Sequence, residues 1–137
     1  MGQHLASGPD VPIVCDMTTA PDTGDERMAE YGRLFADHLV GRERTDDGIR
    51  FRFRAADGVD AWVRSLAARE HACCPFFSSR VTRAGDEVHW TSSVVDDDVA
   101  RAVLEEFYRL PETFAAGLEG LEDRLRRHGL EVLPPAS

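Results

Sequence analysis

The sequence predicts an α/β (α+β) protein built as a two-layer sandwich, with helices packed on a four-stranded, mixed or mainly antiparallel sheet. Apolar and polar residues alternate with the period of a strand over residues 11–16, 49–54, 77–83 and 87–93. Apolar residues recur at helical spacing in the segments between and after these runs. Glycine and proline residues mark the boundaries, so the expected element order is β-α-β-α-β-β-α-α.

The first half of the chain predicts a strand, a helix and a second strand. Residues 11–16 form a short strand, and Pro12 near its start is typical of an edge position. Thr23 and Glu26 have the spacing of a capping box, so a helix begins there. Gly41 is a natural end for that helix, and a turn then leads into the next strand.

The second half predicts a helix, a hairpin and two further helices. A helix that begins near Gly58 ends before Pro75, because a residue that precedes proline is pushed out of helical geometry. Alternating segments on either side of residues 84–86 predict a hairpin. Acidic residues at 96–98 favour the start of a third helix, which Pro111 ends. A fourth helix carries apolar residues at helical spacing: Phe114, Leu118, Leu121 and Leu125.

Length and composition indicate one folded unit. The 137 residues, 42% of them hydrophobic, suffice for a single domain with a core. We expect residues 1–10 to be a flexible N-terminus, residues 11–130 to form the domain and residues 131–137 to be a flexible tail. The sequence offers neither the apolar run of a signal peptide nor the ~20 apolar residues of a membrane span. We therefore expect a cytoplasmic protein without a membrane partner.

The charge distribution argues against a nucleic-acid partner. The formal net charge is −9, whereas binding to a phosphate backbone takes clustered Lys and Arg side chains. The arginines of residues 50–54 alternate with Phe51 and Phe53. This pattern predicts a strand with phenylalanines inside and arginines outside, and no basic tail.

The three cysteines are predicted to be free thiols or metal ligands. Disulfides are rare in a reducing compartment, and an odd number of cysteines precludes complete pairing within the chain. Cys73 and Cys74 are adjacent, and a disulfide between neighbours is strained. The C-x-x-C spacing of redox motifs is absent. We therefore expect three reduced thiols.

The segment 70–77 combines several groups that bind metals. Glu70 lies three and four residues before Cys73 and Cys74, so on a helix its carboxylate and both sulfurs share one face. His71 is within reach of the turn at Pro75. Cys73 could instead continue the apolar stripe of the helix as a small core residue. Two adjacent cysteines before a proline, at a helix end, favour the ligand role.

Electrostatics at this helix end favour a bound cation over a bare thiolate. The C-terminal end of a helix carries partial negative charge, and Glu70 adds to it. Both raise the pKa of nearby thiols, whereas activated cysteines prefer helix N-termini. A cation offsets these negative groups and deprotonates the thiols itself. Arg69 or a more distant arginine would weaken this argument.

Cys15 is the expected third ligand. Its thiol faces the same pocket if the first strand runs beside the strand that follows Cys74. In the alternative, Cys15 is a core residue that alternates with Val11 and Ile13. Three thiolates, or two thiolates with a histidine, suit soft ions such as Zn(II), Cu(I), Hg(II) and As(III).

A family resemblance rests on the sequence Arg69-Glu70-His71-Ala72-Cys73-Cys74-Pro75-Phe76-Phe77. It resembles the E-x-x-C-C-P-F signature of a family of small, largely uncharacterised bacterial proteins. The strand that ends in Cys15 and the strand at 48–53 are similar as well, so the resemblance covers residues 11–95. The family is often associated with mercury- or arsenic-resistance systems, which implies handling of thiophilic toxic elements. The chain departs from the pattern at His71, where arginine is usual, and in two C-terminal helices that look like an extension.

The sequence therefore predicts a site that binds a soft metal or metalloid of the Hg, As, Cu or Zn type, in detoxification or metal handling. Its ligands are Cys15, Cys73 and Cys74, with His71 as a further ligand or Glu70 beside it. The alternative is a cysteine-dependent enzyme, a lyase, isomerase or oxidoreductase that acts on a small molecule. There Cys73 or Cys74 is catalytic, and Glu70 or His71 is the acid or base.

A third hypothesis is an interaction module in which the thiols play no part. Phe76, Phe77 and Trp90 would then pack against a partner. A small sheet with an exposed edge also makes a homodimer plausible.

Overall fold

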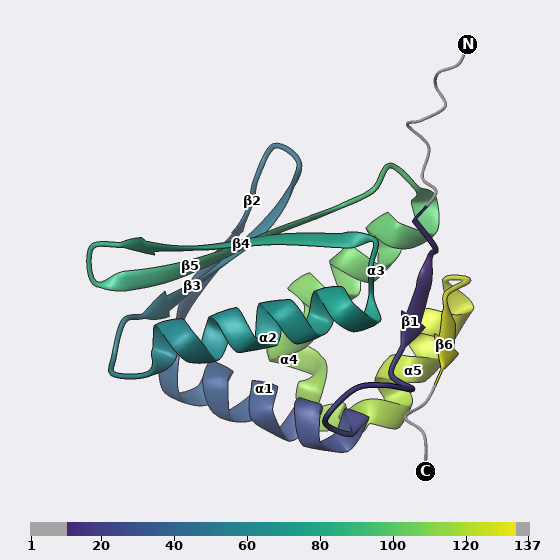
Figure 1. Cartoon of the computed structure of the whole chain (residues 1–137), viewed down its shortest axis with the longest axis horizontal. Coiled ribbons are helices and arrows are strands. Elements are labelled where there is room, and N and C mark those ends of the chain that lie inside the picture. The colour runs from purple at the N-terminus through teal and green to yellow at the C-terminus, as the bar shows by residue number, and fades with distance from the viewer. Residues whose placement is uncertain (1–10, 134–137) are drawn as a thin grey trace.

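The computed structural model describes residues 11–133, and its helices pack on one face of a four-stranded antiparallel sheet (Figure 1). The strand order across the sheet is β2-β3-β5-β4, and every neighbouring pair is antiparallel. The strands are β2 Leu39–Arg44, β3 Gly48–Arg54, β4 Phe77–Ala84 and β5 Glu87–Val94. The predicted α+β class, with helices covering a four-stranded sheet, is therefore confirmed.

The helices begin at residues that satisfy free backbone N–H groups or provide an unusual backbone angle. Thr23 and Glu26 form the predicted capping box at the start of α1. The Asp97 side chain accepts a hydrogen bond from the Ala100 N–H at the start of α3. Gly58, with a φ of +83°, precedes α2. The helices are α1 Gly24–His38, α2 Val59–Cys73, α3 Asp98–Tyr108, α4 Leu110–Thr113, the 3-10 helix η2 Phe114–Ala116 and α5 Gly117–Arg127.

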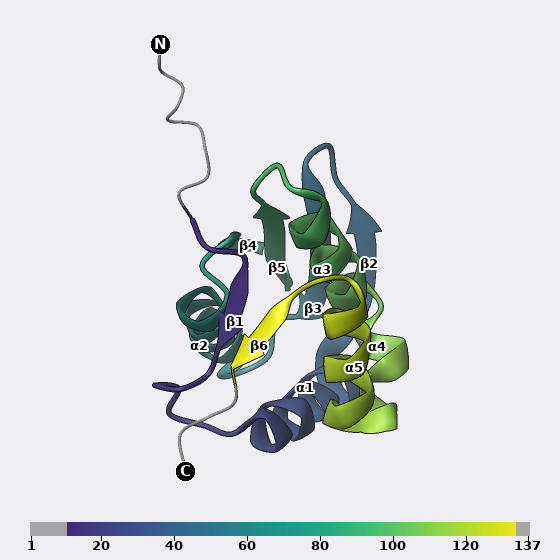
Figure 2. The same ribbon diagram turned by 90° about the vertical axis from the view of Figure 1, so that its right-hand side faces the viewer.

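A second, two-stranded sheet joins the two ends of the described chain. β1 (Val14–Asp16) and β6 (Glu131–Leu133) run side by side and parallel (Figure 2). We expected residues 131–137 to be a tail and the first strand to belong to the main sheet. Instead, residues 131–133 form β6, and β1 pairs with it. The expected flexibility at 1–10 and 134–137 lies outside the described residues.

The fourth strand of the main sheet is β2, which the sequence analysis does not predict. We expected the first helix to end near Gly41. Instead, α1 ends at His38, and β2 begins at the next residue, Leu39. β2 lies at the sheet edge, is mostly half-exposed and contains an irregularity between Leu39 and Gly41. These features obscure the apolar alternation that identifies a strand. The predicted fourth helix is also divided, because Phe114 belongs to η2 and the later leucines to α5.

The core lies between the inner face of the sheet and the helices. The strand β3 alternates as predicted, with Phe51 and Phe53 fully buried and its arginines on the outer face. Tyr31 of α1 stacks on Trp90 of β5 at 6.3 Å between ring centroids. Phe107 of α3 meets Trp90 edge-on at 5.3 Å. Aromatic contacts thus bind α1 and α3 to the sheet and hold the helix layer in place.

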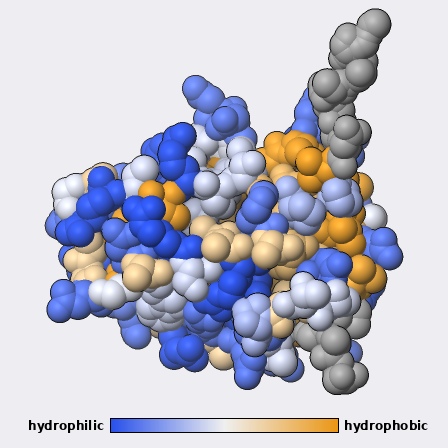
Figure 3. All heavy atoms as spheres, viewed as in Figure 1, coloured by the Kyte–Doolittle hydropathy of each residue, from blue (hydrophilic) through white to orange (hydrophobic). Residues whose placement is uncertain are grey.

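Polar and apolar side chains are unevenly distributed over the surface. On the face shown in Figure 3, hydrophilic side chains dominate the side of the sheet, and apolar ones gather over β1 and the connection that leads into α3. Ile13 next to β1, Val94 at the end of β5 and Val95 after it are partly buried apolar residues of these segments. Within residues 11–133, no helix combines the length and apolar character that a membrane crossing requires.

Candidate functional site

Three thiols meet where β1 passes the C-terminal end of α2. Cys73 is the last residue of α2, Cys74 follows it as the C-cap, and Cys15 lies in the middle of β1. The Cys73 sulfur lies 3.9 Å from that of Cys15 and 3.7 Å from that of Cys74. All three sulfurs lie within 4.8 Å of one another. The structure thus brings together the three cysteines that the sequence proposes as ligands.

Local backbone geometry explains why both adjacent thiols face this point. The Cys74 N–H donates to the Glu70 carbonyl at 2.7 Å, which completes the last turn of α2. Pro75 then prevents the helix from continuing. The Phe77 N–H returns to the Cys74 carbonyl at 2.9 Å, so the chain reverses into β4 at once. This tight turn keeps both sulfurs at the helix end, where Cys73 is 3% and Cys74 6% exposed.

Cys15 reaches the cluster by a different route from the one expected. The sequence argument for Cys15 required β1 to run beside the strand that follows Cys74, but β1 pairs with β6 in the second sheet. In that pairing Cys15 is opposite Val132. The β6 strand therefore holds β1 across the end of α2 and places the third thiol (Figure 2).

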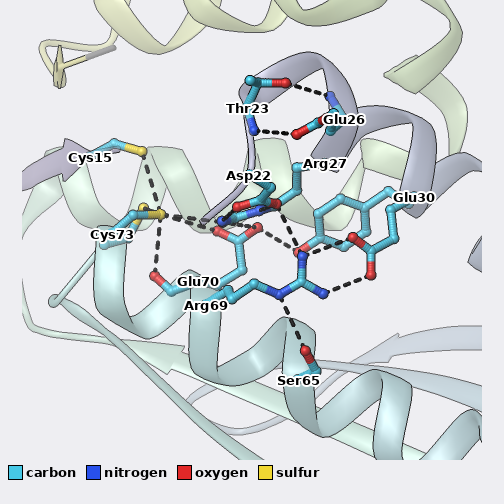
Figure 4. A network of polar contacts seen from close by, with 12 residues as sticks. Cys15, Asp22, Thr23, Glu26, Arg27, Glu30, Ser65, Arg69, Glu70 and Cys73 are labelled. Atoms are coloured by element: carbon cyan, nitrogen blue, oxygen red, sulfur yellow. Dashed lines mark hydrogen bonds and ion pairs between the residues drawn. The ribbon is translucent and has the colours of Figure 1, made fainter. Parts of the chain in front are cut away.

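Arg27 of α1 is the charged partner of the thiol cluster. Its guanidinium lies 3.5 Å from the Cys73 sulfur, and the residue is 5% exposed. Two hydrogen bonds to Asp22, at 2.8 and 2.6 Å, hold the guanidinium in place (Figure 4). A buried arginine with two anionic neighbours stays protonated, so a fixed positive charge faces Cys73.

The electrostatic expectation for the two adjacent thiols is therefore wrong for Cys73 and correct in direction for Cys74. Hydrogen bonds from the Cys15 and Cys74 thiols, together with the Arg27 guanidinium, lower the pKa of Cys73 well below that of a free thiol. The same thiol contacts and burial raise the pKa values of Cys15 and Cys74. These directions favour a thiolate at Cys73 and protonated thiols at Cys15 and Cys74. Hydrogen bonds from the two neighbouring thiols, with the charge of Arg27 from another helix, outweigh the helix end and the nearby carboxylate.

Glu70 lies beside the thiolate as predicted, in a strongly perturbed environment. Its carboxylate is 3.8 Å from the Cys73 sulfur, accepts a 2.6 Å hydrogen bond from the Tyr31 hydroxyl and lies 3.6 Å from Arg27. Burial and the negative charge on Cys73 raise the pKa of Glu70 to about 7, against the opposing effects of Arg27 and Tyr31. Glu70 can therefore hold or release a proton near neutral pH, next to a sulfur.

His71 does not lie with the three thiols. The residue is exposed, and its Nδ1 makes a 2.6 Å hydrogen bond with the Phe77 carbonyl oxygen. Its side chain leaves α2 on the side away from Glu70, as the helical spacing of adjacent residues requires. The structure thus gives His71 a contact in the turn and no contact with the cluster.

Arg69 also has a role other than the one considered. It binds Asp22 at 3.0 Å and Glu30 at 2.8 and 2.7 Å, so it ties α2 to α1. Trp62 adds a 2.6 Å hydrogen bond to Glu30. Arg69 therefore supports the segment that holds Arg27 without contacting a sulfur (Figure 4).

Sequence reasoning missed Arg27, Tyr31 and Asp22 as members of the site. One available signal was the position of Arg27 four residues before Tyr31, on the buried stripe of α1. A charged residue on a buried stripe needs a partner. The sequence could not show that this partner lies 46 residues away at Cys73.

The spacing of the sulfurs suits a thiolate-bound ion. A tetrahedral centre with sulfur ligands at about 2.3 Å places neighbouring sulfurs about 3.8 Å apart. The observed separations of 3.9 and 3.7 Å match this spacing. An ion could therefore bind with little rearrangement, through Cys15, Cys73 and Cys74, which leaves one corner for another ligand.

Comparison of the chain with models of protein families, with curated proteins and with solved structures gave no match. The evidence for the chemistry of this site is therefore its own geometry. Three thiols converge, and the Cys73 sulfur is paired with a buried arginine.

Proposed function

We propose that this protein binds a soft metal or metalloid ion through Cys15, Cys73 and Cys74, in detoxification or metal handling. The observation that carries the proposal is the convergence of all three thiols of the chain within 4.8 Å of one another, from two separate elements. Packing alone does not require three cysteines at one point, because small apolar residues fill such space equally well.

The charge state of the cluster supports capture of an ion. The Cys73 thiolate is available for the first metal–sulfur bond, since Arg27 stabilises it. The bound ion then lowers the pKa of the two remaining thiols and releases their protons. Glu70 lies close enough to take up one of them. Ligand softness favours Hg(II), As(III), Cu(I) or Zn(II) over hard ions.

The resemblance of residues 69–77 to proteins associated with mercury and arsenic resistance points to the same chemistry. Cys73 and Cys74 are more than nine-tenths buried, so little room remains for ligands other than the three sulfurs. The site therefore favours those ions of the set that need few ligands. We therefore place As(III) and Hg(II) ahead of Zn(II), which is almost always four-coordinate.

Titration of reduced, metal-free protein with arsenite, Hg(II) and Zn(II) tests the proposal. Elemental analysis after gel filtration should show one tightly bound As or Hg atom per chain, with sulfur-to-metal absorbance in the ultraviolet. Cys15→Ser, Cys73→Ser and Cys74→Ser should each reduce arsenite affinity by at least a hundredfold. Thr82→Cys, which adds an exposed thiol on β4, is the control and should leave the arsenite stoichiometry unchanged, because a lone thiol holds As(III) only weakly. Affinity no greater than that of dithiothreitol would contradict the proposal.

A second function, a cysteine-dependent enzyme, is favoured by one specific observation. The Cys73 thiolate has a carboxyl group with a pKa of about 7 at 3.8 Å, which is an arrangement of nucleophile and acid. In such an enzyme Cys15 is dispensable for the reaction of Cys73 with an electrophile. Retention of rapid, selective labelling of Cys73 in Cys15→Ser, combined with weak arsenite binding by the wild type, would favour the enzyme.

A further inference from the structure

The three thiols border a cavity of about 120 Å³ whose remaining wall is largely apolar. About half of this wall comes from α3, α5 and β6, through residues that include Val103, Phe107, Leu118, Leu121, Leu125 and Val132. The C-terminal segment, an apparent extension in the sequence, thus encloses the space next to the sulfurs.

The charged groups at the cavity are occupied by partners within the protein. Glu106 accepts hydrogen bonds from Arg124 at 2.9 Å and from His128 at 3.2 Å. Glu122 lies 3.8 Å from Arg126. These partners compensate the carboxylates, so the accessible surface beside the thiols is set mainly by leucine, valine and phenylalanine.

The volume of the cavity exceeds the volume that a bare ion occupies. An ion held among three sulfurs occupies the space between them and leaves the apolar part empty. A dry cavity of ~150 Å³ lined by similar side chains accommodates benzene. A space of about 120 Å³ therefore has room for one small ring or branched alkyl group.

We infer that the thiol site takes a soft centre that carries one apolar carbon substituent, with the substituent in the cavity. A trivalent organoarsenical, R–As(OH)₂ with R up to the size of phenyl, represents this class. The inference rests on the proposed function and deepens it, because the sulfurs hold the arsenic and the cavity selects the substituent.

The binding step is a ligand exchange without oxidation or reduction. Two As–S bonds form as two As–O bonds break, and arsenic remains trivalent. Each hydroxyl leaves as water, with the proton of a thiol or, where the sulfur is already a thiolate, with a proton from solvent. The As–C bond stays intact, and two of the three sulfurs suffice.

Two probes that differ only in their hydrocarbon group distinguish the contribution of the cavity to binding from that of the thiols. Phenylarsonous and methylarsonous acid form the same two As–S bonds, and competition with dithiothreitol corrects for their intrinsic thiol affinities. After that correction, wild-type protein should bind the phenyl compound at least tenfold more tightly than the methyl compound. Methyl groups of Val103 and Leu125 should show ring-current shifts in NMR spectra with the phenyl compound only.

Substitutions at Leu121 test whether the cavity causes this preference. Leu121 is half-buried on α5, so Leu121→Trp should fill the cavity and remove the phenyl preference while methyl binding stays unchanged. Leu121→Met, which nearly conserves volume, is the matched control and should keep the preference. Val103→Phe fills the same space from α3 and replaces Leu121→Trp if that variant does not fold.

The outcomes distinguish the two proposals. Equal corrected affinities for both probes, or a phenyl preference that survives both filling variants, would overturn the cavity inference while arsenite binding upholds the metal site. Failure of arsenite and of both organic probes to bind would overturn the proposed function and the cavity inference together.

Discussion

Replacing Glu70 with Gln should remove a large pH dependence of stability from the metal-free protein. In the folded state, burial raises the pKa of Glu70 from 4.5 to about 7. Because the folded-state pKa is the higher one, the stabilisation is fully present below about pH 4.5 and is lost as the pH rises through 7. At about 1.4 kcal/mol per pKa unit, the loss amounts to about 3 kcal/mol. Gln cannot ionise, so Glu70→Gln should escape this loss.

Glu30→Gln is the matched control and should not show this pH dependence between pH 4.5 and 8. Hydrogen bonds from Arg69 and Trp62 lower the pKa of Glu30. The stabilisation from Glu30 is therefore complete above its ordinary pKa of 4.5 and is lost only at lower pH, so the variant lacks a constant amount between pH 4.5 and 8. Both side chains are less than one-fifth exposed, so solvent screens neither effect fully.

Urea unfolding followed by tryptophan fluorescence, in reductant and chelator, measures both effects between pH 4.5 and 8. Relative to the wild type, Glu70→Gln should become more stable with rising pH by about 3 kcal/mol, whereas Glu30→Gln should be less stable by a nearly constant amount. A constant difference between the wild type and Glu70→Gln, within about 1 kcal/mol, would refute the reasoning about Glu70.

Three further predictions follow from the site and the sheet. Arg27→Gln should raise the pKa of Cys73 by about 1–2 units, the worth of a charged hydrogen bond, whereas Arg69→Gln should not; the pH profile of alkylation by iodoacetamide measures this. Binding of Hg(II) at pH 7 should release between one and two protons to solution, because two of the three thiols have raised pKa values and Glu70 can take up one proton, and a pH-stat detects them. Gly48→Ala should lower the melting temperature by several degrees, since its Cβ would lie 1.9 Å from the Ser92 carbonyl oxygen, and calorimetry reports the change.

Each of these three has a clear contrary result. Equal alkylation profiles for the two arginine variants would show that Arg27 does not stabilise the thiolate. Release of fewer than one proton would show that the cluster is already ionised or that a thiol takes no part. An unchanged melting temperature in Gly48→Ala would mean that β3 and β5 can separate locally without cost.

Local sequence patterns predicted much of the fold because they depend on neighbouring residues. The capping box at Thr23, the end of α2 before Pro75 and the hairpin around Gly85 each depend on interactions within a few residues. The strand β2 escaped prediction, since an edge strand is recognised by its pairing with β3 and not by its own pattern. The role of 131–133 as a strand likewise depends on β1, at the other end of the chain.

For the site, the sequence by itself determined that two thiols and Glu70 lie together at the end of one helix, because residues three and four apart share a helix face. Only the tertiary structure decided the rest. Cys15 lies 58 residues from Cys73 and reaches it through the pairing of β1 with β6. Arg27 comes from another helix, and with the hydrogen bonds from Cys15 and Cys74 it lowers the pKa of Cys73, against the expected direction. Such contacts depend on how the elements pack, and short-range patterns do not encode that packing.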